Sequence, residues 1–195
     1  MKTTINDVTG NWKNVKNKCR TTVNKGYSEL DATPSFKKSL LISEHSPIRL
    51  INVDWSWPDI EYWLSTEWSR HKFEKFISTQ RTDRTGVDRN DKPQGAMVNF
   101  DGYANAQHLI DSWRKRLCGS AAKEAQALAR DFKIKLHDIE PELAEVLVPN
   151  CIYRCGCPEF PNKCMVWKTF KQNNPDIDMT SIRERYDAYN KNIFK

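Results

Sequence analysis

A short stretch of the sequence, EWSRHKFEKFISTQR over residues 67–81, gathers side chains that could hold an anion. It contains three consecutive cationic or protonatable residues and, further along, two hydroxyls and an arginine: Arg70, His71, Lys72, Ser78, Thr79 and Arg81. A phosphate is bound by two or more donors, and an arginine fork with neighbouring hydroxyls supplies them. Cations at a helix C-terminus would also complement the helix dipole. The position of the tripeptide between two apolar segments favours the anion site.

The flanking residues predict the elements that position this tripeptide. Apolar residues at helical spacing between Ile60 and Trp68 predict a helix that ends near Arg70 and His71. Alternation over KFEKFIST predicts a strand directly after it, and alternation over PIRLINVDWSW predicts another strand upstream. The tryptophans at 55, 57, 63, 68 and 113 follow these periods, so we expect them in the core.

Further start and stop signals divide the rest of the chain. Thr9 or Asn11 could cap a helix that runs to about Val23, and Thr33 with Pro34 predicts a helix to about Ile42. Residues 105–147 suggest helices in pieces, one starting at about 119–120, and a closing helix should follow a cap at Asp178 or Thr180. Residues 82–101 are polar and predict a long loop, which in a compact domain is usually functional or mobile.

Composition bounds the class of protein. The chain of 195 residues suits a single domain, and its 38% hydrophobic residues and seven tryptophans exclude a disordered chain. The 31 Lys and Arg exceed the 25 Asp and Glu, so the net charge of +6 favours anionic partners, although solubility alone would also account for it. No apolar run approaches the roughly 20 residues of a membrane span. Without a signal-like N-terminus, we expect a cytoplasmic protein with reduced cysteines.

Two other segments could carry chemistry. The turn-rich segment 151–164 holds Cys151, Cys155, Cys157 and Cys164, but the spacing C-x3-C-x-C-x6-C departs from the paired C-x2-C of zinc sites. We therefore expect structural thiols and no metal, with zinc on these four residues as the alternative. The stretch SWRKRLC puts three cations on one turn of a predicted helix. Such runs usually form a solvated face, and a nucleotide contact is the alternative.

Three motifs together resemble flavin-dependent thymidylate synthases, the ThyX family. Arg70, His71 and Lys72 are similar to the R-H-R that opens the family signature, and Thr79 to Arg81 are similar to its terminal S-x-R with one residue deleted. The stretch EHSPIR resembles an upstream element through Ser46 and Pro47. ELAEVLVPNCIY resembles a later one through Ala144, Pro149 and Tyr153. The set is most similar to short, divergent forms found in phages.

The resemblance implies an α/β (α+β) fold: one domain over 1–195 with a small, mostly antiparallel sheet flanked by helices. It implies reductive methylation of dUMP to dTMP with FAD, NADPH and methylenetetrahydrofolate, in the cytoplasm of the cell or of a phage host. Nucleic acid is then not an expected partner, and such sites are shared between subunits of a homotetramer. The implied contacts to FAD are Ser46, Arg70, His71 and Lys72. The implied contacts to dUMP are Glu67, Arg70, Ser78, Thr79, Gln80 and Arg81, with Thr79 and Arg81 at catalytic positions.

Several positions depart from the family pattern. Glu145 stands where the family has a nucleotide-binding arginine, and Lys171 is the nearest cation to a second one. A lysine does not reproduce the bidentate grip of arginine. The substrate could be another pyrimidine nucleotide, or Arg84 and Arg89 could compensate. The alternative function is a catalytically inactive relative, or a nucleic-acid-binding protein that uses the basic surface.

Overall fold

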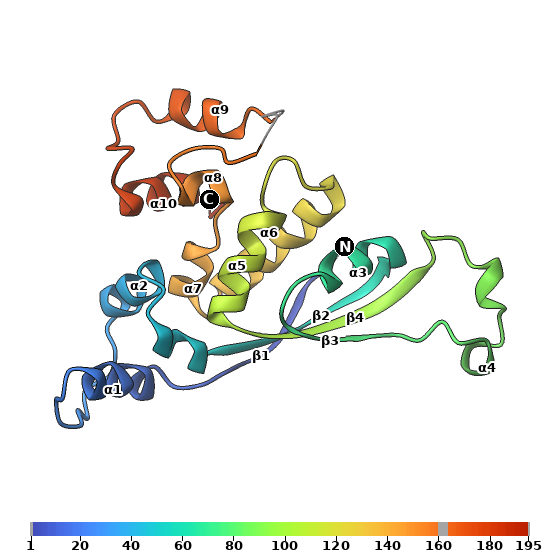
Figure 1. Cartoon of the computed structure of the whole chain (residues 1–195), viewed down its shortest axis with the longest axis horizontal. Helices are drawn as coiled ribbons and strands as arrows, with labels where there is room; N and C mark the ends of the chain where they lie inside the picture. Colours follow the sequence, from blue (N-terminus) through green and yellow to red (C-terminus); the bar gives the residue numbers. More distant parts are fainter. Residues whose placement is uncertain (1, 160–163, 195) are drawn as a thin grey trace.

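One antiparallel sheet of four strands organises the part of the chain that the computed structural model describes, residues 2–159 and 164–194 (Figure 1). The strands lie in the order β1-β2-β4-β3, and all three neighbouring pairs are antiparallel. Their bounds are β1 (Thr4–Thr9), β2 (Asn52–Glu61), β3 (Glu74–Ile77) and β4 (Met97–Asn105). The expected α+β class with a small antiparallel sheet is confirmed.

Helices pack against one face of this sheet and extend beyond it. In chain order the helical elements are α1 (Trp12–Thr22), α2 (Pro34–Ile42), η1 (Ser46–Leu50), α3 (Tyr62–Ser69), α4 (Thr82–Thr85), η2 (Arg89–Asp91), α5 (Ala106–Arg116), α6 (Lys123–His137), α7 (Pro141–Val146), α8 (Asn150–Tyr153), α9 (Val166–Asn173) and α10 (Ile182–Asn190). The sheet face is covered by α3, α5 and α6. Among the described residues, no helix combines the length and the apolar character that crossing a membrane requires.

The core is an aromatic cluster between the sheet and these three helices. Strand β2 alternates buried and partly exposed residues, so Trp55 and Trp57 both point to the helical side. They meet Trp68 of α3, Trp113 of α5 and Phe132 of α6, and the closest pair, Trp113 and Phe132, has ring centroids 4.2 Å apart. The core positions predicted for these tryptophans are confirmed, while Trp63 is only partly buried.

Gly102 lets the Trp55 ring lie directly against strand β4. The residue pairs with Trp55 across β2 and β4, and a Cβ atom at position 102 would overlap the Trp55 ring. The indole therefore occupies the space that any other residue would fill. Sequence patterning did not predict β4. The strand begins at Met97, inside the expected loop 82–101, so the loop prediction was wrong for residues 97–101. The alternation is weak in the sequence because the buried positions include the small residues Gly102 and Ala104, while the outer positions mix polar residues with Met97 and Tyr103.

Caps account for the helix starts that were predicted well. The Asn11 side chain accepts hydrogen bonds from the backbone N–H of Lys13 and Asn14, and Thr33 accepts one from Phe36. The closing helix is capped by Ser181, so the prediction of Asp178 or Thr180 was wrong. Asp178 instead accepts from the backbone and hydroxyl of Thr180 one turn earlier. The helix expected from 119–120 begins later, at Lys123.

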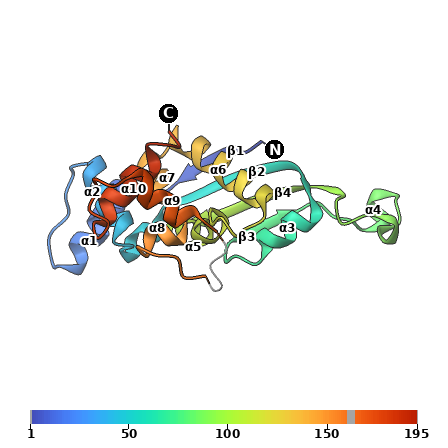
Figure 2. The ribbon, with the colours of Figure 1, turned by 90° about the horizontal axis from the view of Figure 1, so that it is seen from above.

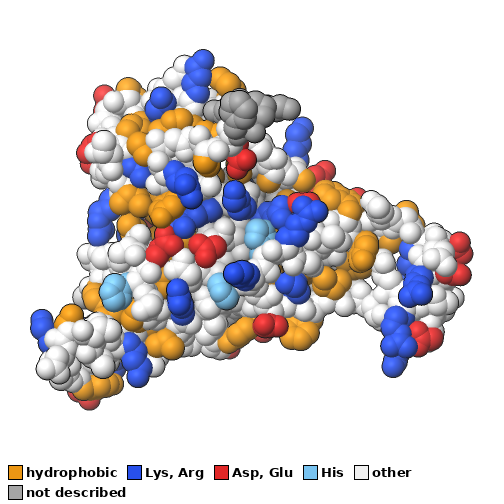
Figure 3. Space-filling model, viewed as in Figure 1, with side chains coloured by type: hydrophobic (Ala, Val, Ile, Leu, Met, Phe, Trp, Pro, Cys, Tyr) orange, Lys and Arg blue, Asp and Glu red, His pale blue; other side chains and the backbone are white. Residues whose placement is uncertain are grey.

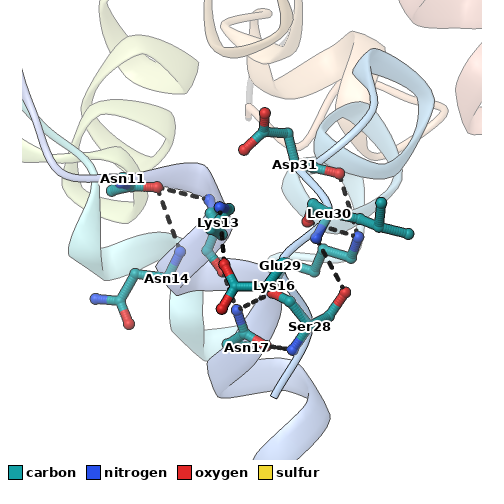
Figure 4. A network of polar contacts seen from close by, with 9 residues as sticks. All are labelled: Asn11, Lys13, Asn14, Lys16, Asn17, Ser28, Glu29, Leu30 and Asp31. Atoms are coloured by element: carbon teal, nitrogen blue, oxygen red, sulfur yellow. Dashed lines mark hydrogen bonds and ion pairs between the residues drawn. The ribbon is translucent and has the colours of Figure 1, made fainter.

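A polar loop after α1 is tied back to that helix (Figure 4). The Asn17 side chain donates to the backbone carbonyl of Ser28 at 3.0 Å and accepts from its N–H at 2.7 Å. Lys16 donates to the backbone carbonyls of Leu30 and Asp31. These bonds pair backbone groups of Ser28, Leu30 and Asp31, so the loop holds one conformation although most of its residues are exposed.

A fully buried lysine joins α6 to the C-terminal end of α7. Lys133 of α6 is 0% exposed, and its Nζ donates to the carbonyls of Ala144 and Leu147 at 2.7 and 2.8 Å. These carbonyls belong to the C-terminal end of α7, which has few partners of its own. Burial lowers the pKa of Lys133 well below its usual range.

Residues 78–96 form an arm that extends away from the body. They connect β3 to β4 and include α4 and η2 (Figure 1). Both ribbon views place α4 at one end of the molecule and α1 at the opposite end (Figure 2). Every residue from Arg81 to Asp91 is exposed. The charged side chains of the arm therefore lie in solvent, away from the sheet and the helices that cover it.

We expect Gly102→Ala to destabilise the fold by about 1–3 kcal/mol, because the added methyl would displace the Trp55 ring in a filled core. Urea denaturation followed by tryptophan fluorescence measures this loss. Gly26→Ala is the matched control, since nothing lies within 4 Å of its added Cβ. Its free energy of unfolding should stay within about 0.5 kcal/mol of the parent. Equal unfolding midpoints for the two variants would contradict the packing role of Gly102.

Candidate functional site

Two adjoining cavities lie beside the turn between α3 and β3. The larger, of about 400 Å³, is lined by Asn52, His71, Lys72, Phe73, Glu74, Lys75, Tyr103, Ala104, Asn105 and His108. The smaller, of about 280 Å³, is lined by Arg70, His71, Lys72, His108, Asp111 and Ser112. The two cavities share His71, Lys72 and His108. Figure 3 shows Lys, Arg and His side chains, together with some Asp and Glu, across the middle of the face in view.

The end of α3 places the tripeptide at these cavities. Arg70 is the C-cap of the helix, and the His71 N–H still bonds to the Trp68 carbonyl at 3.1 Å. Phe73 is then drawn into the core, 7% exposed, as the chain enters β3. The tight turn between the buried Trp68 and Phe73 brings the tripeptide to the rim of the two cavities. The predicted position of Arg70 and His71 at a helix end is confirmed.

His71 is the most constrained residue of the site. Its Nε2 accepts a hydrogen bond from Nε of Arg116 at 2.7 Å, and its ring lies parallel to that of Phe73. Burial, followed by the charges of Arg116 and Lys75, lowers the pKa of His71 to about 4, against a smaller opposing effect of Glu67. The imidazole is therefore neutral at physiological pH.

The cations around His71 differ in how they are compensated. Arg116 is paired with Glu67 at 2.5 Å, and Arg70 reaches the same carboxylate at 3.1 Å. Lys75 donates to the backbone carbonyls of His71 and Phe73. Among the described residues, no carboxylate lies within ion-pair distance of Lys72. Lys72 and the largely exposed Arg70 are consequently the cations most available to a bound anion.

Helix α5 forms the other wall, which the sequence reasoning did not predict. His108, Asp111 and Ser112 are spaced i, i+3 and i+4, so they share the helix face opposite the buried Leu109, Ile110 and Trp113. Asn105 lines the larger cavity and also caps α5 by accepting from the His108 N–H. The polar spacing was visible in the sequence, but nothing there indicated that this face would meet the turn at His71.

The cation run of α5 also differs from the expected solvated face. The Arg114 side chain is 11% exposed, paired with Glu44 and stacked on the Tyr153 ring with its Cζ 3.5 Å from the ring centre. The Arg116 side chain is 10% exposed. Only Lys115 is largely exposed. The expectation was wrong for the two arginines because their planar heads find carboxylate partners on neighbouring elements.

The second half of the predicted site lies on the arm and does not line either cavity. Ser78 pairs with Asn99 of β4 through its N–H and its hydroxyl. Thr79 is exposed and accepts a hydrogen bond from the Arg81 N–H. Arg81 forms a two-pronged pair with Asp83 at 3.0 and 2.7 Å. Gln80 is partly exposed beside them. Within one protomer the structure thus separates residues 78–81 from Arg70, His71 and Lys72.

Ser46 and Glu67 line neither cavity. Ser46 is exposed at the start of η1, and the nearby Glu44 is held on α5 by Arg114 and Gln107. Glu67 faces Arg116 and Arg70, so it acts on the site through these two cations. A larger cavity of about 930 Å³ lies elsewhere, between α6, α9 and the C-terminal residues. It contains none of the predicted nucleotide-binding residues.

The thiols near Cys151 include Cys118, which lies outside the set of four considered as a zinc site. All six are free thiols, and no three His, Cys, Asp or Glu residues within 2–159 and 164–194 are placed to hold a metal ion. Cys155 points away and donates to the Met179 carbonyl. Burial, then the neighbouring thiols of Cys118, Cys164 and Cys157, raises the pKa of Cys151 to about 12. Residues 160–163 of the turn-rich segment lie outside the described part.

Comparison with known proteins places the fold. Neither a protein-family model nor a curated protein matches the sequence. Solved structures do match: the flavin-dependent thymidylate synthase ThyX from Helicobacter pylori, complexed with FAD and dUMP, has a TM-score of 0.61 at 13% identity over 76% of this chain and 100% of that one. The chain has the ThyX fold. A second Helicobacter pylori ThyX structure with FAD and dUMP has a TM-score of 0.60 at 14% identity, over 75% of this chain and 97% of that one.

A related methylase has the same fold. The UMP/dUMP methylase PolB from Streptomyces cacaoi, bound with 5-Br dUMP, gives a TM-score of 0.59 at 11% identity, over 74% of this chain and 93% of that one. On this ThyX fold, Glu145 is committed elsewhere, with pairs to Lys38 at 2.6 Å and His137 at 3.9 Å. Lys171 is exposed on α9. Neither residue lines the two cavities.

We expect Lys72→Ala to weaken binding of ADP, used as a diphosphate probe, by roughly tenfold, because Lys72 is an uncompensated cation at the cavity rim. Isothermal titration calorimetry at low salt measures the affinity. Lys135→Ala, an exposed lysine on α6, is the control with the same charge change. Equal losses for the two variants would show that only the overall charge matters and would remove Lys72 from the site.

Proposed function

We propose that this protein is a flavin-dependent thymidylate-synthase-like enzyme that converts dUMP to dTMP. In this proposal FAD is the cofactor, NADPH the reductant and methylenetetrahydrofolate the carbon donor. The observation that carries the proposal is the pair of joined cavities, lined by Arg70, His71 and Lys72 at the α3–β3 turn of a ThyX fold. The neighbouring folds were solved with FAD and dUMP or with a brominated dUMP.

The residues at the cavities fit the chemistry of FAD. Phosphates need cations with spare hydrogen-bond donors, and Arg70 and Lys72 supply them at the rim. The flavin ring has nitrogen and carbonyl acceptors, which suit the neutral imidazole of His71 as a donor. Ser46 would approach from η1. When bound and reduced, the flavin supplies the hydride. The protein's own task is to fix the ring, exclude water and stabilise negative charge with nearby cations.

The dUMP half of the site would come from Glu67 and the arm. In this proposal Ser78, Thr79, Gln80 and Arg81 hold the nucleotide, with Arg81 on the phosphate. Arg81 is occupied by Asp83, but an exposed ion pair of this kind contributes only about 0–1 kcal/mol, so a phosphate dianion can compete for it. Since the arm extends away from its own cavities, we propose that each site combines the cavity of one subunit with the arm of another, in a homotetramer.

A second candidate is a relative that has lost this activity or acts on another pyrimidine nucleotide. The observation that favours it is Glu145, which replaces a family arginine and is tied to Lys38. The arm arginines Arg84 and Arg89 are exposed and could supply the missing charge. A nucleic-acid-binding role on the basic surface would instead show a steep salt dependence without any bound flavin.

Titration of the purified protein with FAD and dUMP, with the assembly mass measured by native mass spectrometry, tests the proposal. We expect a yellow protein that binds both ligands as an assembly. Stoichiometric FAD binding, with oxidation of the NADPH-reduced flavin that requires both dUMP and methylenetetrahydrofolate, supports the enzyme. Binding of FAD without turnover of dUMP or UMP supports the inactive relative. Failure to bind either ligand at any assembly state refutes the proposal.

We expect Arg81→Ala to weaken dUMP binding by at least tenfold, because the proposal places this guanidinium on the phosphate. FAD binding should be unchanged, since Arg81 does not line the cavities. Arg130→Ala, an exposed arginine of α6, is the control and should leave dUMP affinity as it was. The same loss in both variants would count against the assignment of Arg81.

A further inference from the structure

Arg116 links the end of α5 to the end of α3. It is the last residue of α5, and its guanidinium reaches the turn that carries the tripeptide. Nε donates to Nε2 of His71 at 2.7 Å, one terminal nitrogen donates to the Glu67 carboxylate at 2.5 Å, and the other donates to the Glu67 backbone carbonyl. The side chain is 10% exposed, so solvent competes little for these bonds.

Because the donor is a guanidinium, its hydrogen bond determines the protonation state of His71. A guanidinium has only N–H donors and keeps its proton at any pH that a folded protein tolerates. The ring nitrogen that it binds, Nε2, must therefore be an acceptor without a proton. A neutral imidazole then carries its single proton on Nδ1. The contact with Arg116 thus selects one of the two neutral tautomers of His71 and disfavours the imidazolium.

The ring is also held in direction. It is tilted against Trp68 with centroids 5.8 Å apart and is parallel to Phe73 at 6.3 Å. His71 lines both cavities. Within the described residues, no protein atom accepts a hydrogen bond from Nδ1. The Nδ1–H is consequently available to a ligand in the cavities.

The charged groups around the ring agree with a neutral state. Glu67 of α3 favours the imidazolium, but it is already shared between Arg116 and Arg70. Lys75 of β3 opposes the imidazolium, as does Arg116 of α5. Arg70, Lys72 and His108 line the same cavities, as do the carboxylates Glu74 and Asp111, of which Asp111 lies 3.5 Å from Arg114. Around the two cavities the positive groups Arg70, Lys72, Lys75 and Arg116 therefore outnumber the carboxylates Glu67, Glu74 and Asp111.

We propose that Arg116 is a positioning residue that holds His71 as the neutral Nδ1–H tautomer, so that the site presents an uncharged donor to an acceptor atom of its ligand. This inference rests on the proposed function only in taking the ligand to be a flavin ring, whose carbonyl and nitrogen atoms are such acceptors. The cations Arg70 and Lys72 then serve the phosphates, and His71 serves the ring. The geometry divides the tripeptide into two roles.

Imidazole nitrogen NMR of the ligand-free protein tests the tautomer directly. With histidine labelled by 15N, long-range correlation spectra distinguish a protonated Nδ1 from a protonated Nε2. We expect His71 to show the Nδ1–H pattern and to stay neutral from pH 8 down to about pH 5. A protonated Nε2, or a titration near the ordinary pKa of about 6.5, would overturn the proposal.

Arg116→Gln, compared with Lys115→Gln, tests the role of the guanidinium. Both changes remove one positive charge from the same helical turn, but Lys115 is exposed and pairs with Glu159. In Arg116→Gln the pKa of His71 should rise toward its ordinary value of about 6.5, because the charge of Arg116 is lost while Glu67, burial and Lys75 stay. FAD affinity should then vary with pH between 5 and 8. In Lys115→Gln both quantities should match the parent.

Two safeguards keep the outcomes distinct. Should Arg116→Gln fail to fold, Arg116→Lys retains the charge without the fork, and a mixture of His71 tautomers is expected in it. An unchanged His71 spectrum in a folded Arg116 variant overturns the inference. Absence of FAD binding by the parent refutes the proposed function, while the NMR result still decides the tautomer. Binding of FAD with the same pH dependence in parent and Arg116→Gln refutes only the inference.

Discussion

The contact between the Trp55 indole and the backbone of Gly102 is the constraint on which the rest of this structure depends. It lets an aromatic ring lie directly against β4, where Trp57 and Trp113 contact it and Trp68 contacts both of them. Trp55 and Trp57 belong to β2, whereas Trp68 comes from α3 and Trp113 from α5. Their packing therefore fixes α3 and α5 on the same sheet face, and the ends of both helices meet beside His71. The packing of the aromatic core therefore sets the positions of the residues that line the candidate site.

The positive charge of the chain is used in two ways. Some cations are internal supports: Arg116 joins two helix ends, Arg114 joins α5 to Glu44, and Lys133 caps α7. Others, such as Lys72 on the rim and Arg81 on the arm, face outward. A net charge of +6 does not distinguish these classes. The two classes are distinguished by the hydrogen-bond and ion-pair partners of each cation. A basic composition is therefore weak evidence for a ligand until the cations with internal partners have been set aside.

The sequence predicted what depends on local interactions. The caps at Asn11 and Thr33, the end of α3 at Arg70 and the alternation in β2 all involve residues within a few positions of one another. It did not predict β4, where Gly102 is required by a ring on another strand. It also missed the α5 wall and the role of Arg116, which lies 45 residues from His71 in the chain. A run of three cations looks the same in sequence whether it is hydrated or buried.

The arm has a consequence for how altered chains would behave together. It carries residues 78–81 away from the cavities of its own chain. In the proposed assembly, the two halves of the site would therefore belong to different copies. A chain altered only at the cavity and a chain altered only on the arm would each be defective alone. Mixed in one assembly, they would regenerate some intact sites from an unaltered arm and an unaltered cavity. The proposed assembly would therefore allow complementation in trans, and dilution into single chains would abolish it.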